Sequence, residues 1–208
     1  MRYLGADALS SSKLFIARGF LDAALCHEFS AEARRGKTAP ATIIGIKGKD
    51  LLDERRRRTR RVAVSGAAQH AIQGRFAALL PDLERHFGMR LSGFQDPQFL
   101  RYQRGDFFGP HQDSSSHPDH GLEVRTRKVS VILFLNRQTR FSEPEGYCGG
   151  ELRLFWADGN PDPALHVAGE AGLLVAFPSD LLHEVRPVTH GDRYTVVTWY
   201  VGERAVAQ

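Results

Sequence analysis

Seven short apolar runs, separated by turn residues, fill the second half of the chain and constrain its fold more than any other feature. They are rich in Val, Leu, Phe and Tyr, and no helical pattern lies between them. The runs are PQFLRY, RKVSVILFLN, GGELRLFW, ALHVA, GLLVAFP, HEVRPV and RYTVVTWYV, which begin at residues 97, 127, 149, 164, 172, 183 and 193. Such a series predicts a sandwich or a rolled-up double sheet rather than a parallel α/β fold.

The first half of the chain has a helical pattern with a short extended lead-in. Residues 13–21 suit a strand, and Asp22 is predicted to cap a helix that Gly36 ends. A second helix is predicted from Ser65, with an interruption or restart around Pro81. We therefore expect the α+β class.

Length and composition indicate one globular domain over residues 1–208, with 1–95 as a mainly helical support and 96–204 as the β core. Of the 208 residues, 42% are hydrophobic and 25% are charged. No apolar run approaches the roughly 18 to 20 residues that would span a bilayer, so we expect a cytoplasmic protein without a membrane partner. Cys26 and Cys148 are too few for a disulfide framework and are expected to be free thiols.

Positive charge is concentrated in one segment. The formal net charge is only +4, but ERRRRTRR at 54–61 holds six arginines. A solvated basic loop is one reading of such a run, and binding of an acidic substrate or of nucleic acid is the other.

The stretch HQDSSSHPDH, residues 111–120, is rich in metal-ligand side chains. A closed zinc site within it is disfavoured, because a proline separates its last two histidines and no cysteine is near. His111 and Asp113, two apart on a strand, would face the same way, and His183 is the best candidate for a third ligand. Two histidines and one carboxylate suit non-haem Fe(II), since three positions stay open. The rest of the stretch is expected to be a flexible loop.

Arg193 stands ten residues beyond His183 and begins the last apolar run. If it faces the metal, its guanidinium can hold the distal carboxylate of a dicarboxylic cosubstrate in a two-pronged contact. A surface salt bridge is the alternative.

Four segments in this order resemble the Fe(II)/2-oxoglutarate dioxygenases of the prolyl 4-hydroxylase class, including the oxygen-sensing prolyl hydroxylases. They are RYQRGDFFGPHQD, VSVILFLN, GGELRLF and VAFPSDLLHEVRPVTHGDRYTVVTWY, within residues 97–202. The resemblance implies a double-stranded β-helix, a jelly-roll or cupin-like pair of sheets, with supporting N-terminal helices. It also implies Fe(II), 2-oxoglutarate and O2, with ascorbate as a candidate stimulant.

Carried over by position, the resemblance also implies the site residues. The iron ligands are His111, Asp113 and His183. Arg193 would anchor the C5 carboxylate of 2-oxoglutarate, and Tyr102 matches a tyrosine that lines the cosubstrate pocket, although core packing would also explain it. Oxygen-sensing members often place a tyrosine where this chain has Leu133, so a second hydroxyl contact to the C5 carboxylate is left unassigned.

The implied activity is hydroxylation of an unactivated C–H bond with release of succinate and CO2, with a peptidyl proline as the leading substrate. The same chemistry on a free amino acid or another small metabolite is the alternative. A nucleic-acid demethylase is disfavoured, because those relatives carry a second arginine where this chain has Trp199. A non-catalytic β-barrel binding module is the alternative from another class. The basic segment 47–63 is expected to act like a lid and to receive an acidic peptide or small molecule through residues 55–61.

Overall fold

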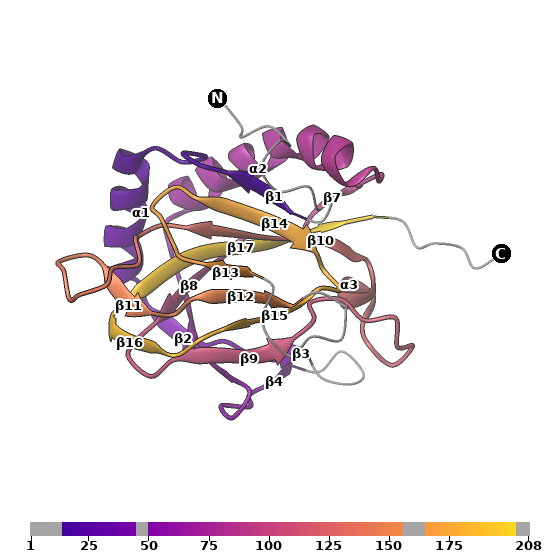
Figure 1. Cartoon of the computed structure of the whole chain (residues 1–208). Coiled ribbons are helices and arrows are strands. Elements are labelled where there is room, and N and C mark those ends of the chain that lie inside the picture. Colours follow the sequence, from indigo (N-terminus) through magenta and orange to yellow (C-terminus); the bar gives the residue numbers. More distant parts are fainter. Residues whose placement is uncertain (1–13, 45–49, 156–164, 203–208) are drawn as a thin grey trace.

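Two antiparallel β-sheets face each other in a computed structural model that describes residues 14–44, 50–155 and 165–202 (Figure 1). The larger sheet runs in the order β1-β14-β10-β17-β8-β6-β2, and β7 pairs with the end of β17. Its strands are β1 (Phe15–Ala17), β2 (Thr38–Pro40), β6 (Arg60–Val62), β7 (Gly93–Phe94), β8 (Gln98–Tyr102), β10 (Arg127–Phe134), β14 (Leu174–Pro178) and β17 (Arg193–Val201).

The smaller sheet runs in the order β13-β12-β15-β9-β5. Its strands are β5 (Arg57–Arg58), β9 (Phe107–His111), β12 (Leu152–Phe155), β13 (Leu165–Val167) and β15 (Leu182–Val185). Two further pairs are β3 (Ile43–Ile44) with β4 (Asp50–Leu51), and β11 (Tyr147–Gly149) with β16 (Val188–Gly191). Each of the seven apolar runs thus overlaps a strand, and the predicted jelly-roll-like pair of sheets is confirmed.

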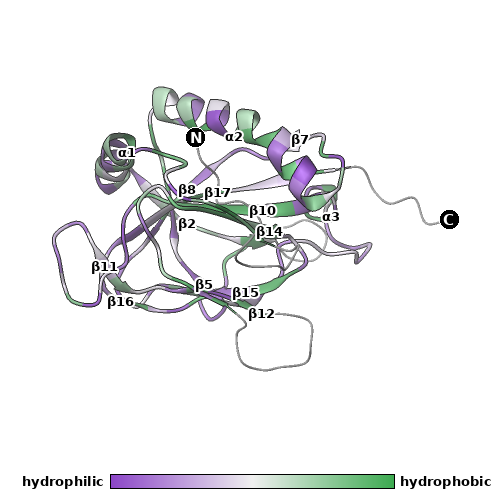
Figure 2. Cartoon of the chain, turned by 45° about the horizontal axis from the view of Figure 1, so that its top comes forward, coloured by the Kyte–Doolittle hydropathy of each residue, from purple (hydrophilic) through white to green (hydrophobic). Residues whose placement is uncertain are grey.

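Helices α1 (Ala23–Arg35) and α2 (Gly66–Phe87) lie on the outer side of the larger sheet (Figure 2). Asp22 caps α1 as predicted, since its carboxylate accepts a backbone hydrogen bond at 2.9 Å from the third residue of the helix. Ser65 caps α2 in the same way. The short helix α3 (Leu122–Arg125) precedes β10, and in the described ranges no helix has the length and apolar character to cross a membrane.

Pro81 lies inside α2 without interrupting it, so the predicted break is wrong. A proline removes one backbone hydrogen bond and its ring crowds the preceding turn. Burial outweighs that cost, because Phe76, Leu79 and Leu83 on both sides of the proline are at most 1% exposed. The Tyr200 hydroxyl, from the sheet, donates to the carbonyl oxygen of Phe76 at 2.6 Å. Contacts with the sheet thus keep the helix continuous.

The two faces of the larger sheet contribute to different hydrophobic cores. On β10, Val129, Val131 and Leu133 pack with the helices, whereas Ile132 and Phe134 pack between the two sheets. From Val129 to Phe134 the strand therefore has an apolar residue at every position but one, because both of its faces are buried. Side chains that face the space between the sheets are the ones that can form a site.

The arginine-rich segment enters both sheets over residues 57–62. β5 pairs with β9, so that Arg57 lies opposite Phe108, and β6 pairs with β8, so that Arg61 lies opposite Leu100. This segment therefore joins the edge of the smaller sheet to the larger one. A lid role for 47–63, of which 47–49 lie outside the described residues, stays a prediction, as do the domain boundaries.

Candidate active site

His111, Asp113 and His183 come together between the sheets. Their ligand atoms all lie within 4.8 Å of one another, and the described part of the chain holds no other group of this kind. β9 and β15 pair so that His111 stands directly opposite His183. Strand pairing thus brings together two histidines that are far apart in the sequence.

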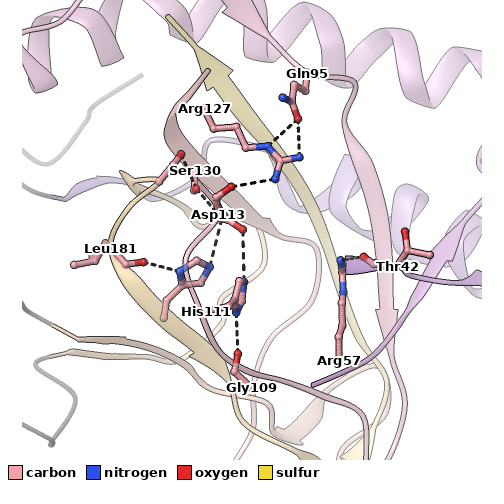
Figure 3. Close-up of polar contacts among 11 residues, drawn as sticks. Thr42, Arg57, Gln95, Gly109, His111, Asp113, Arg127, Ser130 and Leu181 are labelled. Carbon is pink, nitrogen blue, oxygen red and sulfur yellow. Dashed lines mark hydrogen bonds and ion pairs between the residues drawn. The ribbon is translucent and has the colours of Figure 1, made fainter. Parts of the chain in front are cut away.

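Each imidazole is oriented by a backbone carbonyl. Nδ1 of His111 lies 2.8 Å from the Gly109 oxygen, and Nδ1 of His183 lies 2.9 Å from the Leu181 oxygen (Figure 3). A carbonyl oxygen only accepts hydrogen bonds, so in the neutral form of each ring Nδ1 carries the proton and Nε2 keeps its lone pair. The two Nε2 atoms lie 3.5 and 3.4 Å from the carboxylate oxygens of Asp113. This arrangement of donors fits a divalent cation.

Asp113 follows β9 instead of lying on it, so the expectation that one strand face carries both His111 and Asp113 is wrong. Its amide donates to the Ser179 carbonyl at 2.8 Å, and its Oδ2 accepts from the Ser130 hydroxyl at 2.7 Å (Figure 3). Arg127 donates to the Asp113 carbonyl oxygen at 3.2 Å. These contacts, and not the pleat of a strand, point the carboxylate toward the imidazoles.

The protonation states of the group suit metal binding. Burial and the neighbouring His183 lower the pKa of His111 to about 4, so this ring is neutral at neutral pH. Burial alone would raise the pKa of the Asp113 carboxyl, but His183 and His111 hold it well below its usual range. Neutral imidazole and ionised carboxylate are the forms that coordinate a cation.

A buried arginine lies beside the metal-binding group. Phe108 stacks on His111 with ring centroids 3.4 Å apart, and the Arg57 guanidinium lies 4.6 Å from the centroid of Phe108. Arg57 is 7% exposed and donates to the carbonyl oxygen of Thr42 at 2.9 Å (Figure 3). Its Nε has no hydrogen-bond partner among the described residues. Burial, together with Arg61, lowers the pKa of Arg57, while Tyr102 and Asp113 act against that shift.

A cavity of about 420 Å³ is lined by the three metal-binding residues. Much of its wall is apolar, including Leu100, Ile132, Val185, Val197 and Trp199. The charged side chains that line the cavity are mostly positive, because they are four arginines and one carboxylate. The arginines are Arg56, Arg57, Arg61 and Arg127. His120 also lines the cavity, whereas its loop neighbours His117 and Asp119 are exposed.

Arg193 faces the space between the sheets from the larger sheet, but it is not one of the residues that line this cavity. It pairs with Tyr102 across β17 and β8, and its guanidinium lies 5.0 Å from the ring centroids of both Tyr102 and Phe134. One terminal nitrogen is 3.4 Å from the Thr195 hydroxyl, but Nε and Nη2 are unpartnered within the described ranges. A surface salt bridge does not suit a side chain that is 1% exposed. A carboxylate has the geometry that would satisfy such a guanidinium.

On β10, the side chain next to the Arg193 guanidinium is that of Phe134. The sequence-based match of Leu133 to the tyrosine of the oxygen-sensing members is wrong. Leu133 packs with the helices because adjacent strand residues point to opposite faces. Tyr102 is 3% exposed and does line the cavity. Tyr147 also lies close to Arg193. The sequence around Tyr147 contains no motif that predicts this location.

Comparison with known proteins identifies the family. The family model described as "2OG-Fe(II) oxygenase superfamily" matches residues 97–201, half of the chain. The chain therefore belongs to the 2OG-Fe(II) oxygenase superfamily. Membership implies Fe(II), 2-oxoglutarate and O2 as metal, cosubstrate and oxidant, and it confirms the double-stranded β-helix as the core.

Within that superfamily the chain is similar to prolyl hydroxylases and PKHD-type hydroxylases. A PKHD-type hydroxylase of Shewanella sp. (strain MR-7) is 41% identical over 106 residues, which are 51% of this chain and 42% of that protein. The chain thus matches less than half the length of this curated relative. A Pseudomonas putida prolyl-4-hydroxylase structure is 25% identical with a TM-score of 0.70, covering 96% of this chain and 97% of that one. A Trichoplax adhaerens prolyl hydroxylase, solved with a hypoxia inducible factor peptide fragment, shares the fold at 18% identity, covering 94% and 86%, with a TM-score of 0.72.

Proposed function

We propose that this protein is an Fe(II)- and 2-oxoglutarate-dependent dioxygenase that hydroxylates an unactivated C–H bond and releases succinate and CO2. One observation carries the proposal. Two imidazoles and one carboxylate share a cavity wall, and a buried arginine, two of whose nitrogens have no partner among the described residues, faces the space between the sheets. The first feature suits an open Fe(II) site, and the second suits the far end of a dicarboxylic acid.

Each residue then has a defined role. His111, Asp113 and His183 hold the iron, which when bound activates dioxygen together with the keto acid. Arg193 binds the C5 carboxylate, and Tyr102 limits the space beside it. The apolar wall around the metal excludes water from the reacting atoms.

Anaerobic titration tests this proposal directly. Adding Fe(II) and 2-oxoglutarate should produce the weak visible charge-transfer band of a chelated keto acid, and His183→Ala should abolish it. His120→Ala is the matched control, because it removes a histidine of the same cavity that lies outside the metal-binding group. If the wild-type protein binds no iron and gives no band, the chain is a β-barrel binding module and the enzyme proposal is wrong.

A peptidyl proline is the substrate that we propose. Support comes from the similarity to the Pseudomonas putida prolyl-4-hydroxylase, which extends over nearly the whole of both chains. A screen that measures succinate release should favour proline-containing peptides over free amino acids and other metabolites. If only metabolites are turned over, the substrate is a small molecule, and the proposed chemistry stays the same.

We further propose that the substrate is acidic. With Fe(II) and 2-oxoglutarate bound, the two charges of the ion and the two of the cosubstrate cancel, so the four arginines of the cavity face only Asp113. Burial lowers the pKa of Arg127, and Arg57 and Arg61 lower it further, while Asp113 and Glu123 raise it. The arginines thus repel one another across the cavity, and an anionic group on the substrate would relieve that repulsion.

A pair of double variants with equal charge tests the acidic substrate. Arg56 and Arg61 line the cavity, whereas Arg55 and Arg58 belong to the same run and do not. Changing Arg56 and Arg61 to Gln should raise the substrate KM about tenfold and leave uncoupled 2-oxoglutarate turnover nearly unchanged. Changing Arg55 and Arg58 to Gln should have little effect on either. Equal KM values for both double variants would remove the idea.

A further inference from the structure

The hydroxyl of Tyr147 is buried, and the described residues offer it no well-formed hydrogen bond. Tyr147 begins β11, is 0% exposed, and its Oη has no partner among the residues that the structure describes. A buried, unsatisfied hydroxyl is costly, and most buried polar groups in native proteins are paired. Its position therefore suggests a bound ligand as the partner of this hydroxyl.

Tyr147 lies beside Arg193. A Cβ atom built on Gly150 would be 3.1 Å from Cδ of Arg193 and 3.2 Å from Cε2 of Tyr147, so both side chains border the space beside this glycine. Burial raises the pKa of Tyr147, while the Arg193 charge and the contacts of the hydroxyl with the Arg193 guanidinium and the Gly169 backbone act against that rise. The guanidinium can only donate, and no acceptor satisfies its Nε and Nη2 within the described ranges. Two neighbouring donors without an acceptor are complementary to a carboxylate.

A second glycine provides room for the Tyr147 hydroxyl. A Cβ atom on Gly169 would lie 2.1 Å from Oη of Tyr147 and 2.6 Å from Cδ1 of Phe134. Any side chain at 169 would therefore displace the hydroxyl from this location. Phe134 lies against the Arg193 guanidinium but has no hydroxyl of its own. Phe134 on β10 thus supplies no hydroxyl beside Arg193, whereas Tyr147 on β11 can supply one.

We propose that Tyr147 donates the second hydrogen bond to the C5 carboxylate that Arg193 binds, and so selects a dicarboxylic cosubstrate. This inference rests on the proposed function, because it assumes that 2-oxoglutarate binds at Arg193. A role in core packing alone would need only the ring, which phenylalanine supplies equally well.

Ligand binding by the Mn(II)-loaded protein, measured by calorimetry without turnover, tests the proposal. Two probes are compared: 2-oxoglutarate, and 2-oxopentanoate, which keeps the keto acid but lacks the distal carboxylate. Tyr147→Phe should weaken 2-oxoglutarate binding about tenfold, since a hydrogen bond to a charged group is lost, and should leave 2-oxopentanoate binding unchanged. Gly169→Ala should act in the same direction, because its methyl group displaces the hydroxyl.

Tyr200→Phe is the matched control. It also removes one buried tyrosine hydroxyl, but that hydroxyl bonds to Phe76 outside the site. It should lower the unfolding midpoint without changing 2-oxoglutarate affinity, whereas Tyr147→Phe should not lower the midpoint of the unliganded protein. Unchanged 2-oxoglutarate affinity in Tyr147→Phe would overturn the inference alone. Failure of the wild-type protein to bind 2-oxoglutarate would overturn the proposed function as well.

Discussion

Ser130 is the one polar side chain among residues 129–134 of β10, and it orients the Asp113 carboxylate. Its hydroxyl lies 2.7 Å from Oδ2 of Asp113 and 3.0 Å from the hydroxyl of Ser179. Because the carboxylate can only accept, Ser130 donates to it. A residue that does not touch the metal thus positions one that does.

Ser130→Ala should weaken metal binding by about tenfold, in line with the loss of other groups that orient metal ligands. The Asp113 carboxylate would keep its charge but lose one of its fixed partners. Titration with Fe(II) under anaerobic conditions measures the effect. Asp113→Ala should abolish binding and turnover, while His120→Ala should leave iron binding intact. If Ser130→Ala and the wild type bind Fe(II) with equal affinity, the backbone contact between Asp113 and Ser179 is sufficient to position the carboxylate.

The sequence located some residues of the site and misplaced others for physical reasons. His111, Asp113 and His183 were recognisable because they stand within segments that resemble, in order and spacing, the Fe(II)/2-oxoglutarate dioxygenases. Phe134 and Leu133 could not be told apart, since a strand that is buried on both faces lacks the alternation that reports direction. Tyr147 could not be found, because its role depends on which side chain of another strand it meets.

At the scale of elements, strand pairing sets the geometry of the site. β9 and β15 place His111 opposite His183, and β8 and β17 place Tyr102 opposite Arg193. The apolar runs predicted β8, β10 and β17 well, but not β9, whose sequence FFGPH contains glycine and proline. The pairing of β5 with β9 was also not predictable, since a run of arginines has no strand pattern.

Helix α1 supports this framework from outside, and its cap offers a test of stability alone. Asp22→Ala removes the side-chain bond to the Leu25 amide and should cost about 1 kcal/mol of unfolding free energy. Chemical denaturation measures the change, and activity should stay the same. Glu28→Ala, at an exposed position of the same helix, should change the unfolding free energy much less. A similar loss in both variants would mean that removing a negative charge near the start of α1, and not breaking the cap, is responsible, since alanine is a better helix former than glutamate.

At the scale of the whole molecule, the proposed ligands would connect the two sheets. The metal-binding histidines belong to β9 and β15 of the smaller sheet, and Arg193 belongs to β17 of the larger one. A cosubstrate that binds both the metal and the guanidinium would therefore hold the sheets together.

Metal and 2-oxoglutarate together should raise the unfolding temperature substantially. A ligand at 100 times its dissociation constant stabilises the native state by about 2.7 kcal/mol, which corresponds to roughly 5 to 10 °C for a chain of this size. Differential scanning fluorimetry with Mn(II) and 2-oxoglutarate measures the shift. Arg193→Leu should remove most of the gain from 2-oxoglutarate but keep the gain from Mn(II). Equal shifts in both proteins would place the distal carboxylate elsewhere.

The closeness of Gly169 to the Tyr147 hydroxyl also has an evolutionary consequence. A methyl group at 169 and a tyrosine at 147 cannot occupy the same space, so neither position can drift independently. Lineages that keep the tyrosine should keep the glycine, and alanine or serine at 169 should occur only where 147 carries a shorter side chain. These two positions, 22 residues apart, should therefore be inherited as a pair.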